Sequence, residues 1–121
     1  MTKGEIMTVR RVVPDIQSDA MEESRDFYGL LGLEEVMNLG WVRTMASPSQ
    51  PTAQVILMTS DPTGTVTPDM SIEVEDVDAV YAAVLDSGAK IVRPLQDEEW
   101  GVRRFFVSDP NGRVVNVVSH L

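Results

Sequence analysis

Apolar and polar positions in the first half of the chain follow a strand-like pattern, then a helical one, then a strand-like one again. Val9 to Ile16 is rich in β-branched residues and predicts a strand, and Pro14 within it favours a strand start or a sheet edge. From Asp19 to Gly32 the apolar residues have helical spacing, which predicts a helix with Asp19 as N-cap and Gly32 as stop. Three strand-like runs follow at Leu33 to Leu39, Trp41 to Ala46 and Ala53 to Thr59.

The same order begins again after a loop from Ser60 to Pro68, which contains prolines and a glycine. Met70 to Val74 predicts a strand, and Asp76 and Gly88 bracket a second helical stripe as N-cap and stop. An Asn-Gly pair within Asp109 to Gly112 predicts a hairpin turn, because both residues tolerate positive φ. The remaining strands are predicted at Lys90 to Leu95, Val102 to Val107 and Val114 to Ser119.

The repeated order predicts an α+β fold built from two βαβββ modules, at about residues 9–60 and 69–121, in one domain after an extension of residues 1–8. Each sheet is expected to pack its helix on one face and to line a cleft with the other. Ile72 and Val74 alternate with Ser71 and Glu73, so the first pair should meet the helix. The second pair should face the cleft together with Asp69.

Composition narrows the function classes. The chain of 121 residues has no cysteine, which excludes disulfides, thiolate nucleophiles and Cys-ligated zinc. It has no apolar run long enough to cross a membrane and no signal-like start, so a cytoplasmic protein without membrane contact is expected. The net charge of −9 argues against nucleic-acid binding. An acidic surface favours solubility, or attraction of a cationic ligand.

Several segments together resemble the glyoxalase/bleomycin-resistance/dioxygenase (vicinal oxygen chelate) superfamily, from about Val9 to His120. The matching segments are Val12-Val13-Pro14, Ser24 with Phe27-Tyr28, Leu31-Gly32-Leu33, Val74 to Ala79, and Phe105 to Gly112 followed by Val114-Val115. The resemblance implies an eight-stranded, cup-shaped cleft and a homodimer. The enzymes of this superfamily bind a divalent metal through His, Gln or Glu at fixed strand positions.

Those metal positions are occupied here by Val12 or Val13, by Asp69 and by Asn116. One carboxylate and one amide fall short of the three or four donors that such a metal needs. His120, next to the C-terminal residue, favours a solvated tail residue over a ligand. The resemblance therefore implies the metal-free, bleomycin-resistance-like branch, with no cofactor and a divalent metal only as the alternative.

Nine residues are predicted to bind a small-molecule ligand: Trp41, Arg43, Met58, Asp69, Glu73, Trp100, Arg104, Phe106 and Asn116. The tryptophans either fill the core or form stacking walls for a flat or cationic ligand. Met58 either fills a core gap or lines an apolar pocket. Asn116 is either an exposed edge residue or a site residue. No catalytic residue is assigned.

The acidic run Asp97 to Glu99 beside Trp100 is either a solvated loop or a negative cleft mouth. Arg103 and Arg104 alternate across one strand, so one of them should point inward, to pair with Glu73 or hold a carboxylate. Three functions follow: a metal-free binder of a cationic or aromatic ligand, a metal-dependent lyase or dioxygenase with an atypical ligand set, and a non-catalytic interaction module.

Overall fold

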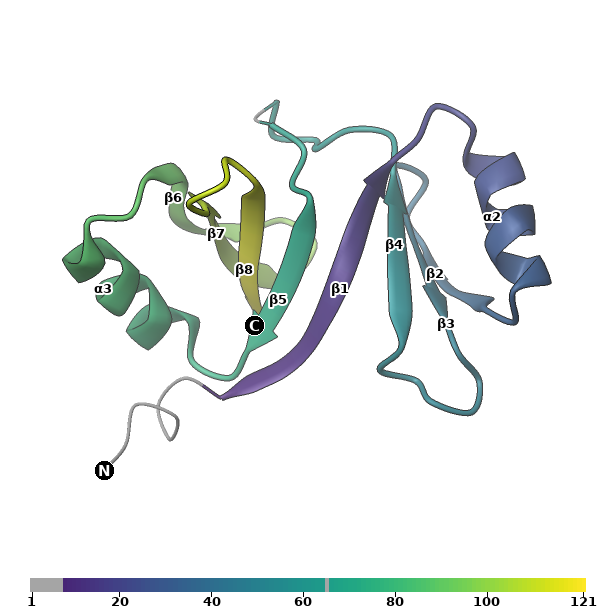
Figure 1. Ribbon diagram of the computed structural model, residues 1–121, viewed down its shortest axis with the longest axis horizontal. Helices are drawn as coiled ribbons and strands as arrows, with labels where there is room; N and C mark the ends of the chain where they lie inside the picture. The colour runs from purple at the N-terminus through teal and green to yellow at the C-terminus, as the bar shows by residue number, and fades with distance from the viewer. Residues whose placement is uncertain (1–7, 65) are drawn as a thin grey trace. The chain divides into compact units, whose positions relative to one another are not determined.

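A computed structural model describes residues 8–64 and 66–121 of the chain, and over these residues the fold is α+β. The first module contains β1 (Val9–Gln17), α2 (Met21–Leu30), β2 (Glu34–Asn38), β3 (Val42–Ala46) and β4 (Gln54–Met58). The second contains β5 (Met70–Val74), α3 (Val77–Ser87), β6 (Ile91–Glu98), β7 (Val102–Ser108) and β8 (Val114–His120) (Figure 1). This order confirms the two predicted βαβββ modules.

The chain forms two compact units whose boundary falls inside β1. Unit 1 comprises Met1–Val12 and Pro68–Leu121, and unit 2 comprises Val13–Thr67. Just before β1, the carbonyl of Thr8 accepts a hydrogen bond from the backbone N–H of Glu75, 3.0 Å away. The start of β1 therefore belongs with β5, whereas its end belongs with β4. Residues 1–7 of the predicted N-terminal extension lie outside the described part.

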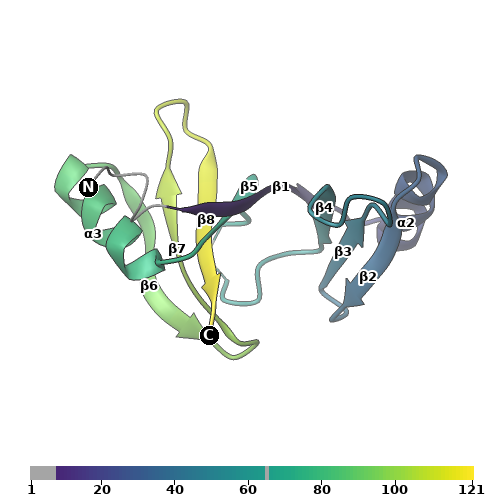
Figure 2. The ribbon, with the colours of Figure 1, turned by 90° about the horizontal axis from the view of Figure 1, so that it is seen from below.

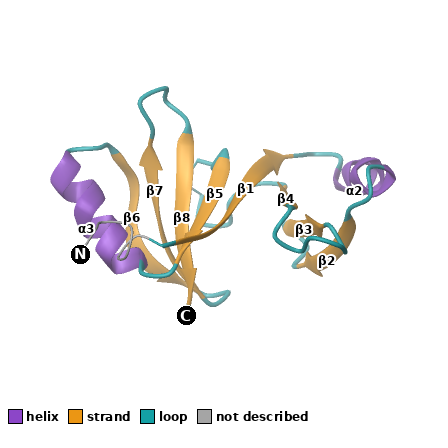
Figure 3. Ribbon diagram, turned by 60° about the horizontal axis from the view of Figure 1, so that its bottom comes forward, coloured by secondary structure: helices purple, strands orange, loops and turns teal. Residues whose placement is uncertain are grey.

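In unit 1 the strand order is β5-β8-β7-β6, and α3 covers one face of this sheet (Figure 3). Ile72 and Val74 pack with Val77, Tyr81 and α3's other apolar residues on that face, as predicted. Phe105 is fully buried there, and the Tyr81 ring lies 4.8 Å from its ring, centroid to centroid. The opposite face of the sheet is consequently the one that displays Ser71 and Glu73.

The ends of α3 follow the sequence prediction. The side chain of Asp76 accepts a hydrogen bond of 3.1 Å from the N–H of Ala79, as an N-cap does. Gly88 ends the helix in the left-handed conformation, with φ of 79°. A residue with a Cβ would be strained there, so glycine is the residue that this end requires.

In unit 2 the strands follow the order β2-β3-β4-β1, and α2 lies beside β2 and β3 (Figure 2). β3 pairs antiparallel with β4, and β1 pairs parallel with β4. Unlike α3, α2 buries none of its residues, and the side chains of Phe27, Leu30 and Leu31 are 56%, 86% and 66% exposed. The apolar stripe that predicted this helix is therefore only partly covered by its own sheet.

The predicted start of α2 is wrong by one residue. Asp19 is not the N-cap: the helix begins at Met21, and its N-cap Ala20 has no side-chain hydrogen bond. Ser18 takes part instead, because its hydroxyl accepts from the N–H of Ala20 at 2.9 Å. At the other end Gly32, with φ of 108°, follows the last turn and acts as the predicted stop.

Two further local predictions need correction. Pro14 lies in the middle of β1 rather than at its start, directly before the residues that pair with β4. In the turn between β7 and β8, only Gly112 has a positive φ, so Asn111 does not adopt the backbone that the Asn-Gly pair predicted. Asp109 organises this turn, since its Oδ1 accepts from the N–H groups of Asn111 (2.8 Å) and Arg113 (2.9 Å).

No helix within residues 8–64 and 66–121 is long and apolar enough to span a membrane.

Candidate functional site

Four of the predicted ligand-binding residues share one face of the unit 1 sheet, the face that α3 does not cover. β7 and β8 pair Phe106 with Asn116, and β5 and β8 pair Ser71 with Asn116. Because side chains alternate along a strand, Glu73 and Arg104 lie on this same face. We call the surface formed by Ser71, Glu73, Arg104, Phe106 and Asn116 the polar face.

Asn116 lies at the centre of the polar face and is half-buried. Its Nδ2 donates to the hydroxyl of Ser71 over 3.0 Å, whereas its Oδ1 is buried and has no hydrogen-bond partner. Buried polar atoms nearly always have a partner, so this oxygen is an exception in an otherwise satisfied strand. The prediction of an exposed edge residue is wrong, because β8 lies between β5 and β7.

Arg104 is the inward member of the predicted arginine pair. It is 4% exposed, and its Nε and Nη2 donate to Glu98 Oε2 at 2.9 and 2.6 Å. The carboxylate that it holds is that of Glu98. The guanidinium carbon also lies 4.8 Å from the ring centroid of Trp100 and 4.6 Å from that of Phe106, so one cation contacts both aromatic rings.

The acidic run beside Trp100 does not act as one group. Glu98 is 8% exposed and also accepts from Arg93 at 2.9 Å, so it is a buried partner of two arginines. Asp97 instead pairs at 2.6 Å with Arg103, on the α3 side of the sheet, and this hydrogen bond lowers the pKa of Asp97. Glu99 is exposed. The run is neither a uniformly solvated loop nor a negative mouth.

Arg11 is a residue of this face that sequence reasoning missed. Its Nε lies 2.5 Å from Glu73 Oε1, and both side chains are mostly buried, with 21% and 16% exposure. His120 Nε2 lies 3.9 Å from the same carboxylate oxygen, and its side chain is 63% exposed, as expected for a tail residue. Arg11 and Glu73 are 62 positions apart in the sequence, so only the pairing of β1 with β5 brings them together.

Asp69 has a structural partner. Its Oδ2 accepts from the N–H of Val114 over 2.9 Å, and its own N–H donates to the carbonyl of Val114 over 2.8 Å. These two bonds join the residue before β5 to the first residue of β8. The side chain is exposed at the end of the sheet rather than grouped with Asn116.

The three predicted site residues of unit 2 do not share one face. Trp41 and Met58 pack with Val13, Val42 and Ile56 in a core cluster. Arg43 pairs with Leu57 across β3 and β4, whereas Met58 pairs with Val42, so Arg43 points to the other face.

On that face Arg43 serves as an anchor for α2. Its Nη2 donates to Glu22 Oε1 of α2 at 2.6 Å, which lowers the pKa of Glu22, and its Nη1 lies 3.6 Å from Glu35 Oε1. An arginine that holds the helix in this way is a structural residue of unit 2.

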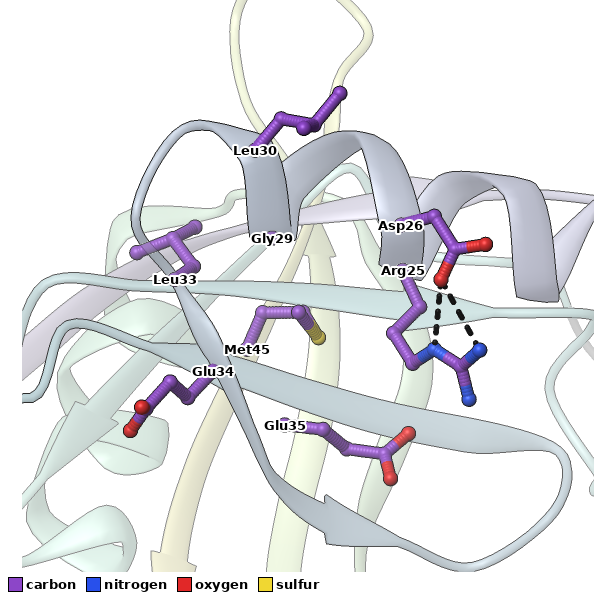
Figure 4. A pocket seen from close by; sticks show the side chains of 8 residues that line it. All are labelled: Arg25, Asp26, Gly29, Leu30, Leu33, Glu34, Glu35 and Met45. Carbon is purple, nitrogen blue, oxygen red and sulfur yellow. Dashed lines mark hydrogen bonds and ion pairs between the residues drawn. The ribbon is translucent and has the colours of Figure 1, made fainter.

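A hollow of about 550 Å³ lies on this α2 side of unit 2. Figure 4 shows that Met45 lies between α2 and β2, with Arg25 bonded to Asp26 on the helix and Glu35 on the strand. The lining residues are Arg25, Asp26, Gly29, Leu30, Leu33, Glu34, Glu35 and Met45. None of the nine predicted ligand-binding residues lines it.

The residues present fit a divalent metal poorly. No group of three His, Cys, Asp or Glu residues able to hold a metal ion occurs among the described residues. Val13 is a fully buried core residue, and the carboxylate of Asp69 is engaged by a backbone N–H. At the last-strand position, Asn116 contributes an amide that already donates to Ser71.

Solved structures with the same fold come from several bacteria. One, described as an NAD-dependent benzaldehyde dehydrogenase from Legionella pneumophila, has a TM-score of 0.73 at 15% identity, covering 91% of this chain and 99% of that chain. A glyoxalase/bleomycin resistance protein/dioxygenase superfamily member from Vibrio splendidus 12B01 has a TM-score of 0.68 at 19% identity, covering 94% and 100%. These identities show a shared fold only.

A third similar structure is a Mn(II)-bound glyoxalase from Novosphingobium aromaticivorans, with a TM-score of 0.61 at 21% identity over 92% of this chain and 38% of that chain. A search of curated proteins finds none that matches. The sequence model of the Glyoxalase/Bleomycin resistance protein/Dioxygenase superfamily matches residues 8–117, which is nearly the whole chain. The chain therefore belongs to the glyoxalase/bleomycin resistance protein/dioxygenase superfamily.

Proposed function

We propose that this protein binds a small planar aromatic molecule on the polar face of unit 1 and does so without a metal ion. The observation that carries the proposal is the half-buried indole of Trp100, held against Arg104 beside Phe106. An indole fixed in this way offers a stacking surface at little entropic cost. Aromatic pairs of this kind contribute about 0.5–1.5 kcal/mol beyond the burial of area.

Asn116 supports the proposal with a polar contact. Its Oδ1 has no hydrogen-bond partner, which lowers the free energy of unfolding by about 1–3 kcal/mol, and a hydrogen-bond donor on a ligand would remove this loss. Ligand sites in proteins combine apolar walls with a few polar groups that fix orientation. A ring bearing a hydroxyl or amine group matches Trp100 and Asn116 together.

The charges of this face favour a neutral or anionic ring over a cation. Three arginines (Arg11, Arg93 and Arg104) stand against two glutamates (Glu73 and Glu98). Unit 2, by contrast, holds eight acidic residues and two arginines, so most of the net charge of −9 belongs to unit 2. Of the two ligand types expected from the sequence, the aromatic one is therefore proposed and the cationic one is not.

A matched series of naphthalenes tests the proposal. 2-Naphthol, 2-naphthoate and 2-naphthylmethylammonium share one ring system and differ in charge, and saturation-transfer NMR reports their binding to the full chain. The neutral and anionic compounds should bind more tightly than the ammonium. Trp100→Ala should abolish binding, whereas Trp41→Phe should leave it unchanged. If none of the compounds binds, or if they bind equally well to Trp100→Ala, the proposal is wrong.

The metal-dependent alternative, a lyase or dioxygenase with an atypical ligand set, would need donors beyond Asp69 and Asn116. Metal analysis of protein purified without chelators tests it directly. We expect less than about one tenth of an equivalent of Ni, Zn, Fe or Mn. A stoichiometric metal that is lost in an Asp69→Ala variant would favour the enzyme instead.

A homodimer is part of the proposal. The exposed apolar residues Leu30, at the end of α2, and Leu31, its C-cap, each lie about one turn from the exposed Phe27, and exposed apolar patches mark interaction surfaces. Sedimentation velocity should give about twice the chain mass of 13.4 kDa. A protein that stays monomeric at all concentrations would contradict the proposed homodimer. It would not affect the proposal that the polar face binds a ligand.

A further inference from the structure

Trp100 lies in the turn between β6 and β7, outside both strands. Gly101, with φ of 91°, follows Trp100, and its N–H donates to the carbonyl of Glu98 over 3.1 Å. Strand alternation fixes the face on which Phe106 and Asn116 lie, but it does not fix the orientation of a residue in a turn. The indole therefore needs side-chain contacts to fix it.

Arg104 makes such a contact and is itself held on several sides. Its guanidinium lies 4.8 Å from the Trp100 ring and 4.6 Å from the Phe106 ring, measured to the centroids. Two nitrogens of its guanidinium, Nε and Nη2, donate to Glu98 Oε2. A planar guanidinium can stack on rings and bind a carboxylate at once, which a lysine ammonium cannot do.

Glu98 is fixed in turn by Arg93. Its second oxygen, Oε1, accepts from Arg93 Nη2 over 2.9 Å. The three side chains are 13%, 4% and 5% exposed for Arg93, Glu98 and Arg104, so the network is shielded from solvent and from screening by salt. This chain of contacts runs from Arg93 in β6, through Glu98 at the end of the same strand, to Arg104 in β7.

We propose that Arg104 is a positioning residue: held by Glu98 and Arg93, it fixes the indole of Trp100 over the polar face. Without it, the turn keeps its backbone bond at Gly101 but the indole gains freedom to move. The inference rests on the proposed function only because that function supplies the ligand that Trp100 would bind. The immobilisation of the ring is a property of the free protein and is measured without any ligand.

Acrylamide quenching of Trp100 fluorescence tests the proposal in a Trp41→Phe background, where Trp100 is the only tryptophan. Arg104→Gln should raise the bimolecular quenching constant at least twofold and lower the fluorescence anisotropy. The matched control is Arg103→Gln on the same strand, which removes an equally charged side chain that pairs with Asp97 and Asp78 on the other face. This control should leave both readouts unchanged.

The Arg104→Gln change leaves Glu98 buried with one partner, so the variant could unfold. The second variant, Arg104→Lys, keeps a positive charge beside Glu98, but its ammonium cannot stack on the rings and bind the carboxylate at once, so the same rise in quenching is expected. A second reporter, Trp41 in a Trp100→Phe background, should not respond, because it packs against the core cluster of Val13, Val42, Ile56 and Met58.

Unchanged quenching and anisotropy of Trp100 in the folded Arg104→Lys variant would overturn the proposal. A rise that Arg103→Gln or Trp41 shares would overturn it as well, because it would show a general loosening. If quenching behaves as expected but no naphthalene binds, then the positioning role stands and the proposed function fails.

Discussion

Arg103 and Arg104 are neighbours on β7 but lie on opposite faces of the unit 1 sheet. Arg103 is partly exposed on the α3 side and pairs with Asp97 and Asp78, whereas Arg104 is buried beside two rings and pairs with Glu98. The hydrogen bonds that Arg103 donates to Asp97 and Asp78 raise the pKa of Arg103 above its ordinary value. One strand thus offers two arginines with similar partners and very different surroundings.

The first prediction compares the stability of the two arginine variants. Surface ion pairs contribute little, so Arg103→Gln should lower the free energy of unfolding by no more than about 1 kcal/mol. Arg104→Gln breaks a buried pair and should cost about 3 kcal/mol. Urea unfolding measures both. Added salt should weaken the Arg103 contribution and leave that of Arg104 nearly unchanged, and equal costs for the two variants would contradict the burial described.

The second prediction concerns the core between α3 and its sheet. Phe105 is fully buried against Tyr81, so Phe105→Ala should cost about 3–5 kcal/mol through lost burial and a cavity. Leu85, on the same helix, is 51% exposed, and Leu85→Ala should cost less than about 1 kcal/mol. Chemical denaturation followed by circular dichroism provides both values. A small cost for Phe105→Ala would mean that α3 is not packed on this face.

The third prediction makes the same comparison in unit 2. Met45 is 1% exposed, so Met45→Ala should cost about 2–5 kcal/mol. Leu30→Ser changes a side chain that is 86% exposed and should leave the free energy of unfolding within about 0.5 kcal/mol of the parent. The Leu30 variant should instead weaken self-association, which sedimentation velocity detects. A marked loss of monomer stability in Leu30→Ser would show that α2 packs differently.

The fourth prediction is a pH dependence at the β7–β8 turn. Hydrogen bonds from the backbone of Arg113 and Asn111 lower the pKa of Asp109 below its ordinary value of 3.8. The unfolded state therefore takes up the proton first, and the stabilisation is present above pH 3.8 and lost as the pH falls through the lower, folded-state pKa. Asp109→Asn should destabilise the protein at pH 7, and the difference from the parent should shrink below pH 3.8.

Urea midpoints at pH 7, 5 and 3 check this, with the exposed α3 variant Asp86→Asn as control. The control should lie close to the parent at each pH. A difference between parent and Asp109→Asn that stays constant across this range would show that the carboxylate charge is not what holds the turn.

Much of the fold was predictable because its signals are local. Asp76 and Gly88 bracket α3 as their chemistry requires, and the alternation of Ile72 and Val74 with Ser71 and Glu73 assigns the faces of β5. The failed N-cap at Asp19 is also local: Ser18, one residue earlier, takes the N–H of Ala20, and the helix then begins one residue late.

The site was only partly predictable because its contacts join distant strands. Arg104 and Asn116 were placed by alternation, and both lie on the polar face. The partner of Glu73 was not foreseen, since Arg11 reaches it only through the pairing of β1 with β5. Arg43 and Met58 were grouped together wrongly, because their faces depend on the register of β3 against β4, which no pattern within either strand determines.

The boundary inside β1 has a practical consequence for dissecting this protein. A fragment that begins at Pro68 looks like a complete βαβββ module, yet it lacks the first strand segment of unit 1. It would expose the backbone edge of β5 and leave the carboxylate of Glu73 without Arg11. Bare strand edges recruit other chains, so such a fragment should aggregate, and supplying Thr8–Val12 as a separate peptide should restore its solubility.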